Sequence, residues 1–210
     1  MGLWCNRLSR VGAVGVQSYT SLFSAKGRRW PVAQELILND ELKSRPVRLA
    51  IMTVSDTRTL ENDTSGEALV KMATADGHEV VERILVPDDI YRIRYEVSRW
   101  IIDPNVEAVI STGGTGLTGR DGTPEAVSPL FDRTIDGFGE LFRHVSYQTV
   151  GTSTIASRAV AGVANGTFIF TLPGSTGACK DAWKGVLRDQ LDSSHRPCNL
   201  VELMPRLTES

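Results

Sequence analysis

Short apolar segments alternate with stretches of helical periodicity along this chain, and that alternation restricts its fold more than any other feature. The apolar segments are bounded by turn residues and are too short for helices, which is typical of buried strands. Between them, apolar residues recur every three or four positions, as on the inward face of a helix. The expected strands are residues 47–54, 78–86, 106–111 and 167–172, and the expected helices begin near residues 64, 90, 124, 138 and 178. This order predicts an α/β fold, a three-layer α/β/α sandwich around a mostly parallel sheet.

Polar residues mark where the expected helices begin. Thr64 opens a capping box, in which its hydroxyl would accept a hydrogen bond from the first helical turn. Thr123 is the expected cap of a helix starting at Pro124, because proline suits the first helical position. Asp88 or Asp89 is expected to cap the helix that follows the second strand. The loops between strand ends and helix starts then share one edge of the sheet, where open α/β sheets bind ligands.

The strongest chemical signal is a glycine-rich loop directly after the third expected strand. It consists of Thr112, Gly113, Gly114, Thr115 and Gly116. Glycines allow positive φ angles and close approach of a ligand to the backbone. Successive N–H groups in such a loop form an anion-binding nest. A tight turn alone would need fewer glycines, so the loop is predicted to cradle a phosphate or a polar heterocycle.

Two acidic residues are expected to face this loop. Asp121 lies just after it, and a carboxylate beside a bound phosphate repels that phosphate unless a cation lies between them. Mg²⁺ in proteins takes one or two carboxylates together with phosphates and water, so Asp121 is a candidate metal ligand; the alternative is an ordinary surface residue. Asp88 ends the second strand and would face the same cleft, unless it only caps a helix. Arg120 could pair with a phosphate.

Two further segments carry candidate binding residues, each with a structural alternative. Asp63, Ser65 and Gly66 open the first helix, whose amides suit an anion. Simple capping of that helix would explain the same residues. Ser157 precedes Arg158, which either binds an anion or forms a salt bridge.

A second glycine-containing loop precedes the last expected helix. It begins with Pro173, Gly174 and Ser175. Its amides, at the start of a helix, also suit a phosphate. The alternative is a simple strand-to-helix turn in which Ser175 or Thr176 caps the helix.

Other enzyme motifs do not fit. Residues 114–119 match GxGxxG, but a dinucleotide-binding helix should begin at once, whereas the helix here is expected only at Pro124. An NAD-linked oxidoreductase is therefore disfavoured, and no GxxxxGK(S/T) P-loop is present. The three histidines share no spacing for a metal or a catalytic triad, and we interpret them as surface or structural residues. Of three cysteines without paired spacing, Cys179 is expected in the core.

The composition restricts partners and compartment. The chain has 23 Lys and Arg against 25 Asp and Glu, a net charge of −2, which argues against nucleic-acid binding. No apolar run approaches the roughly 20 residues of a membrane span, so no membrane association is expected. The absence of a disulfide or zinc pattern favours a reduced, cytoplasmic location.

The first 34 residues differ from the rest because they contain basic but no acidic residues. The basic residues are Arg7, Arg10, Lys26, Arg28 and Arg29. This stretch is either a disordered tail or over-long start of the reading frame, an organelle transit peptide, or a functional basic arm; it lacks the apolar run of a secretory signal. We therefore expect a basic, disordered N-terminal extension at 1–45, a binding domain at 46–190 and a C-terminal tail at 191–210.

Taken together, these loops resemble a known family. The shared segments, in order, are Thr112-Gly-Gly-Thr-Gly116, Arg120-Asp121, Thr123-Pro-Glu125, Gly137-Phe-Gly139, Ser157-Arg158 and Pro173-Gly174. The set resembles the molybdopterin adenylyltransferase family, the MoaB/Mog group, with which the related domains of gephyrin and plant molybdenum-cofactor proteins belong. The resemblance covers about residues 46–200 and is strongest to the MoaB branch. Residues 1–45 have no counterpart in the short family domain.

The resemblance implies an activity. Family members transfer AMP from ATP to the terminal phosphate of molybdopterin, releasing pyrophosphate, with Mg²⁺. By resemblance, Asp88 and Asp121 would be the acidic pair that holds Mg²⁺, the 112–116 loop would bind pterin or phosphate, and Ser157 would lie near the substrate. Some MoaB-branch members lack the acidic pair and are suspected to be inactive; its presence here favours a working enzyme. The alternative is a binding or scaffold protein without chemistry.

The resemblance also implies partners. Family domains assemble as trimers or hexamers, so a homotrimer or homohexamer is expected. Molybdopterin and ATP are the expected small-molecule partners. Other molybdenum-cofactor enzymes are a further option, because adenylyl-molybdopterin accepts molybdate in a later step.

Overall fold

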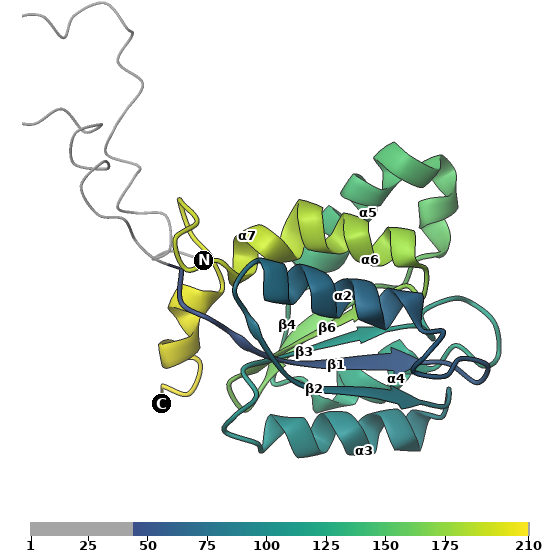
Figure 1. The fold of residues 1–210 in the computed structure, drawn as a ribbon, viewed down its shortest axis with the longest axis horizontal. Helices are drawn as coiled ribbons and strands as arrows, with labels where there is room; N and C mark the ends of the chain where they lie inside the picture. The colour runs from purple at the N-terminus through teal and green to yellow at the C-terminus, as the bar shows by residue number, and fades with distance from the viewer. Residues whose placement is uncertain (1–43, 210) are drawn as a thin grey trace, which may run out of the picture. The chain divides into compact units, whose positions relative to one another are not determined.

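The computed structural model describes residues 44–209, in which helices cover both faces of a six-stranded sheet (Figure 1). The expected extension at 1–45 lies outside the described residues, apart from residues 44 and 45. The elements in chain order are β1 (Arg48–Val54), α2 (Thr64–Ala75), β2 (Glu79–Val86), α3 (Ile90–Ile101), β3 (Ala108–Thr112), α4 (Thr123–Val127), η1 (Ser128–Leu130), β4 (Arg133–Thr134), α5 (Asp136–Val150), η2 (Gly151–Ala156), β5 (Ala161–Ala164), β6 (Thr167–Leu172), α6 (Thr176–Ala182), η3 (Trp183–Leu187), α7 (Arg188–Leu191) and η4 (Val201–Arg206).

The sheet has the strand order β2-β1-β3-β6-β5-β4. The first four strands are parallel, β5 runs antiparallel to β6, and β4 runs antiparallel to β5. The predicted mostly parallel sheet is thus confirmed. The two short strands β4 and β5 were not predicted and add an antiparallel edge.

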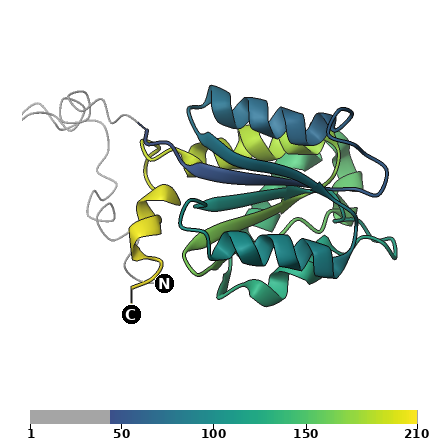
Figure 2. The same ribbon diagram turned by 60° about the horizontal axis from the view of Figure 1, so that its bottom comes forward.

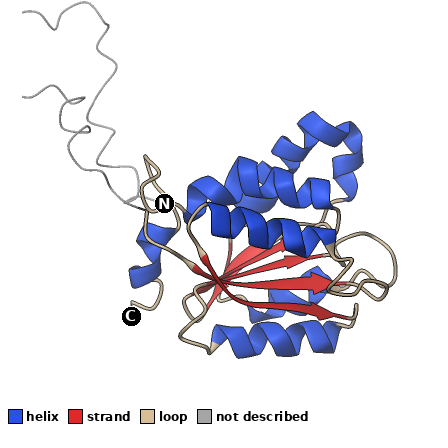
Figure 3. Cartoon of the chain, viewed as in Figure 1, coloured by secondary structure: helices blue, strands red, loops and turns tan. Residues whose placement is uncertain are grey.

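Each central strand is buried on both faces, as a parallel sheet between helix layers requires. In β1, Leu49 and Ile51 point into the core beneath α2, α5 and α6, while Ala50 and Met52 point into the core above α3 and α4. Figure 2 shows the two helix layers on opposite sides of the strands, and Figure 3 distinguishes helices from strands by colour. The three-layer sandwich predicted from the sequence is confirmed.

Two helix caps differ from the prediction. Asp63, not Thr64, caps α2 by accepting a hydrogen bond from the Gly66 N–H at 3.0 Å. The Thr64 hydroxyl instead lies 2.9 Å from the hydroxyl of Thr176. Thr123 lies inside α4, and its hydroxyl donates to the Gly113 carbonyl at 2.9 Å, so it fixes the glycine loop rather than capping a helix.

The segment after residue 190 also takes part in the fold. Val201, in η4, is 2% exposed and belongs to the core on the α2 side. Residues 191–209 therefore pack against the domain. None of the helices within residues 44–209 combines the length and apolar character that crossing a bilayer requires.

His78, which precedes β2, makes stability depend on pH. The residue is 6% exposed, and its Nδ1 accepts a hydrogen bond from the Val47 N–H at 3.3 Å. Burial lowers the pKa of His78 below 6.5, despite the nearby carboxylates of Asp76 and Asp192. The folded state then binds this proton less readily than the unfolded chain does. His78 stabilises the fold above pH 6.5, and that contribution is lost as the pH falls below this value.

We expect the free energy of unfolding to decrease by up to about 1.4 kcal/mol per pH unit below pH 6.5 through this residue. Urea unfolding at a series of pH values measures the slope. In His78→Asn the amide oxygen can still accept the Val47 N–H but cannot titrate in this range. That variant should show a smaller slope; an unchanged slope would assign the pH dependence to other groups.

Candidate functional site

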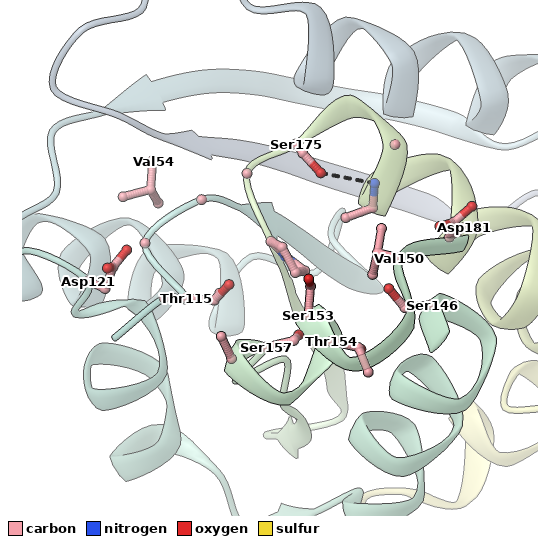
Figure 4. A pocket seen from close by; sticks show the side chains of 18 of the residues that line it. Val54, Thr115, Asp121, Ser146, Val150, Ser153, Thr154, Ser157, Ser175 and Asp181 are labelled. Carbon is pink, nitrogen blue, oxygen red and sulfur yellow. Dashed lines mark hydrogen bonds between the residues drawn. The ribbon is translucent and has the colours of Figure 1, made fainter. Parts of the chain in front are cut away.

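The candidate site is a cavity of about 690 Å³ at the carboxyl edge of the parallel strands (Figure 4). The register aligns Thr53 of β1, Thr112 of β3 and Leu172 of β6, so the loops that follow these strands meet at this edge. Residues of α5, η2 and α6 form the remaining wall. The cavity lies where ligands bind in open α/β sheets.

The glycine loop after β3 forms one wall of the cavity. Gly113 has φ +105°, and a Cβ atom there would lie 2.1 Å from the Val54 carbonyl oxygen. Gly114 has φ +63°. The N–H groups of Gly114 and Thr115 donate to no other residue within 44–209. The loop therefore presents free backbone donors in the geometry of an anion-binding nest.

Asp121 lines the cavity beside Gly116. Its carboxylate accepts hydrogen bonds from the Thr118 hydroxyl at 2.5 Å and the Thr118 N–H at 2.8 Å. These bonds, helped by the Gly116 N–H, outweigh partial burial and hold the pKa of Asp121 below its usual value. The side chain is therefore a fixed, ionised carboxylate at neutral pH.

Asp88 lies against Gly114, because a Cβ atom on that glycine would be 3.0 Å from both carboxylate oxygens. Within residues 44–209 it accepts one long hydrogen bond, from the Gly122 N–H at 3.4 Å. Burial, together with the nearby carboxylates of Asp121 and Asp56, raises the pKa of Asp88. The alternative role as a helix cap falls to Asp89, which accepts from the first amides of α3.

The acidic pair fits a partly solvated Mg²⁺ site. Within residues 44–209, no three His, Cys, Asp or Glu side chains converge into a metal site supplied by protein alone. Mg²⁺ does not need such a set, because it is commonly held by one or two carboxylates plus phosphates and water. Burial is the main cause of the raised pKa of Asp88, and repulsion from the neighbouring carboxylates adds to it; a cation near Asp88 and Asp121 would compensate that repulsion.

The structure brings most of the predicted binding residues to the cavity, but not all of them. Those that line it are Gly113, Gly114, Thr115, Gly116, Asp121, Ser157, Pro173, Gly174 and Ser175. Those that do not are Asp63, Ser65, Gly66, Thr112, Asp88, Arg120 and Arg158. Asp88 nevertheless contacts the cavity wall through Gly114.

The helix start formed by Asp63, Ser65 and Gly66 is buried behind the wall instead of facing a ligand. Asp63 accepts hydrogen bonds from its own helix, from Thr53 in β1 and from two arginines, Arg58 and Arg83. Burial would raise the pKa of Asp63, but the Arg83 hydrogen bond and the other donors hold it below its usual value. We assign this cluster the capping role that the sequence left open.

Arg158 also differs from its expected role as an anion ligand. Its Nε donates to the Gly116 carbonyl and its Nη2 to the Asp121 carbonyl, both at 2.7 Å, while Nη1 pairs with Glu125. All three groups are thus used to hold the glycine loop in shape. The salt-bridge alternative is the one found.

Two other predicted residues have structural partners. The guanidinium of Arg120 pairs with Asp56 at 2.6 Å and remains exposed. The Thr112 hydroxyl donates to the Pro173 carbonyl at 2.8 Å. Thr112 therefore fastens the two glycine-containing loops to each other.

Several cavity residues were missed by the sequence analysis. Arg58, after β1, lines the cavity and donates through Nη2 to the Gly174 carbonyl at 3.0 Å. Hydroxyl groups from α5 and η2 and one carboxylate from α6 complete the wall. They belong to Ser146, Thr149, Ser153, Thr154 and Asp181. For Arg58, a basic residue in the loop after a buried strand was an available signal; for the others the sequence offered none.

Gly114 supplies a direct test of the loop. An alanine there would be strained at φ +63°, and its Cβ would lie 2.3 Å from the Thr123 hydroxyl and 3.0 Å from Asp88. We expect Gly114→Ala to lower the free energy of unfolding by about 1–3 kcal/mol. In the control Gly137→Ala, a Cβ would contact nothing within 4 Å, so stability should change by less than about 1 kcal/mol. Chemical denaturation compares the two; equal effects would contradict the tight packing of the loop.

Residues 50–193 match the sequence profile of the family described as "Probable molybdopterin binding domain". The chain belongs to this molybdopterin-binding domain family. The "Molybdenum cofactor biosynthesis protein B" of Escherichia coli strain K12 is 54% identical to it over 154 residues, which cover 73% of this chain and 91% of that protein. The protein of the same name from Staphylococcus aureus strain MRSA252 is 43% identical over 152 residues, or 71% and 90% of the two chains.

Solved structures of the family share the fold. A crystal structure of molybdenum cofactor biosynthesis protein B superposes with a TM-score of 0.69 at 42% identity, covering 70% of this chain and 92% of that one. The tungsten cofactor synthesizing protein MoaB from Pyrococcus furiosus gives 0.61 at 34% identity, with 67% and 89% covered. The resemblance to the MoaB/Mog group predicted from the sequence is confirmed.

Proposed function

We propose that this protein acts in molybdenum cofactor biosynthesis and transfers AMP from ATP to molybdopterin, giving adenylyl-molybdopterin and pyrophosphate, with Mg²⁺. One observation carries the proposal: Asp88 lies against Gly114 and Asp121 against Gly116 of the cavity-lining glycine loop, whose Gly114 and Thr115 N–H groups donate to no other residue within 44–209. The names of the similar proteins, which refer to molybdenum cofactor biosynthesis, support the pathway.

The reaction joins two phosphate groups. A terminal phosphate oxygen of molybdopterin attacks the α-phosphorus of ATP, and the new P–O bond forms as the bond to the bridging oxygen breaks. Pyrophosphate leaves with that oxygen. No protein nucleophile is needed, so catalysis rests on positioning and on stabilising negative charge.

The residues of the site suit these two tasks. The N–H groups of Gly114 and Thr115 would bind phosphate oxygens in the nest formed by the loop. Asp88 and Asp121 would hold Mg²⁺, which when bound neutralises phosphate charge and polarises the phosphorus that is attacked. Thr112, Arg58 and Arg158 would keep the loops in place through their bonds to backbone carbonyls.

The test mixes the full chain with molybdopterin, ATP and Mg²⁺ and follows the mixture by mass spectrometry. We expect adenylyl-molybdopterin and pyrophosphate to form, and to be absent when EDTA removes the metal. The outcome that would overturn the proposal is tight molybdopterin binding without product under all conditions. That result would indicate a carrier or scaffold role instead.

A further inference from the structure

The cavity has a second carboxylate, Asp181, far from the proposed acidic pair. Asp181 lies on α6, and Figure 4 shows it at the opposite side of the view from Asp121. The side chain is partly buried at the cavity wall. Its carboxylate forms no hydrogen bond or ion pair with any other residue in the described part of the chain. A partly buried carboxylate without a protein donor leaves its oxygens open to donors from a ligand.

Elsewhere the cavity wall carries further polar atoms without partners. The Oγ1 of Thr154 and the Oγ of Ser157 are buried and accept or donate no hydrogen bond within residues 44–209. Both residues line the same cavity, as does the buried Ser146 of α5. Unpaired buried hydroxyls cost free energy, so the cavity suits a ligand rich in ring nitrogens and oxygens.

We propose that Asp181 recognises the pterin ring of the substrate by accepting hydrogen bonds from its 2-amino group and its N3–H. These two N–H donors are adjacent and parallel, like those of a guanidinium, and an ionised carboxylate accepts such a pair with both oxygens. This inference rests on the proposed function, because it assigns the pterin end of that substrate to the α6 side of the cavity.

Charge then orients the substrate. The unpaired Asp181 carboxylate repels a phosphate, whereas the free amides of Gly114 and Thr115 attract one. A molecule with a donor-rich ring at one end and a phosphate at the other would therefore bind in a single direction. That direction places the phosphate beside Asp121, whose charge the proposed Mg²⁺ would compensate, where the proposed transfer takes place.

The test compares two fluorescent ligands, 6-hydroxymethylpterin phosphate and the corresponding lumazine phosphate. Lumazine has a carbonyl oxygen in place of the 2-amino group, so it lacks one of the two donors. We expect the wild-type chain to bind the pterin about 10-fold or more tightly than the lumazine. In Asp181→Asn the amide presents one donor and one acceptor, which opposes the pterin edge but matches the lumazine edge. The preference should therefore vanish or reverse.

A matched control is Asp189→Asn, which makes the same change on α7 outside the cavity and should keep the wild-type preference. A structural role for Asp181 would weaken both ligands equally and leave their ratio unchanged, and that result would overturn the inference. If wild type makes adenylyl-molybdopterin while Asp181→Asn keeps its preference for pterin, only the inference fails. If wild type neither binds the pterin nor forms product, the proposed function and the inference fail together.

Discussion

Replacing Asp121 with asparagine is expected to lower the rate of adenylyl-molybdopterin formation about 100-fold or more while the fold is kept. The asparagine oxygen can still accept the Thr118 hydrogen bonds that place this side chain beside Gly116. What the variant loses is the negative charge. Because Mg²⁺ is bound through ionised oxygens, the loss should also raise the Mg²⁺ concentration needed for half-maximal turnover.

The matched control for the acidic pair is Asp89→Asn. Asp89 is next to Asp88, but it is exposed and its carboxylate caps α3, a role that asparagine fills equally well. Turnover and its Mg²⁺ dependence should therefore stay close to wild type in Asp89→Asn. Near-normal turnover in Asp121→Asn would remove Asp121 from the mechanism, whatever the behaviour of the control.

The sequence predicted the position of the candidate cavity because a buried strand and a glycine-rich segment follow one another directly. A buried strand that ends in several glycines predicts both a parallel sheet and a loop whose backbone approaches a ligand. The positive φ angles of Gly113 and Gly114 confirm the prediction that this loop needs glycine for its backbone conformation. The strand ends then had to meet at one edge, since parallel strands share their direction.

The antiparallel edge of the sheet was missed for a physical reason. Strand β5 is made of small residues and includes Gly162, which weakens a strand by its own preference. Here a Cβ on Gly162 would lie 2.3 Å from the ring of Phe131, so the glycine makes room for an aromatic side chain. Tertiary packing thus selects a strand that local propensity disfavours.

Side-chain roles were harder to predict than positions. The sequence does not predict that the Arg158 guanidinium donates to the Gly116 and Asp121 carbonyls, because those partners are distant from Arg158 in the sequence. Ser146 and Asp181 reach the cavity only because α5 and α6 pack over the edge of the sheet. Such residues carry no local motif, and only the assembled fold identifies them.

The largest expected effect on stability comes from Asp63→Ala. The buried Asp63 carboxylate accepts hydrogen bonds from Thr53, from the Gly66 N–H that starts α2, and from Arg58 and Arg83. Alanine would leave two partly buried guanidinium groups and a helix start without their acceptor. We expect the free energy of unfolding to fall by about 3–5 kcal/mol, the usual cost of breaking a buried ion pair from one side.

Asp63→Asn separates shape from charge in this cluster. Asparagine can still cap α2 and fill the space, so its cost should be smaller, about 1–3 kcal/mol. The lowered pKa of Asp63 also gives a pH signature. Its stabilising contribution is complete above the ordinary pKa of 3.8 and is lost as the pH falls below that value, so wild type and Asp63→Asn should converge in acid. Equal costs for the two variants at neutral pH would show that the charge of the side chain, which both variants lack, rather than the space it fills or its capping hydrogen bond, stabilises the start of α2.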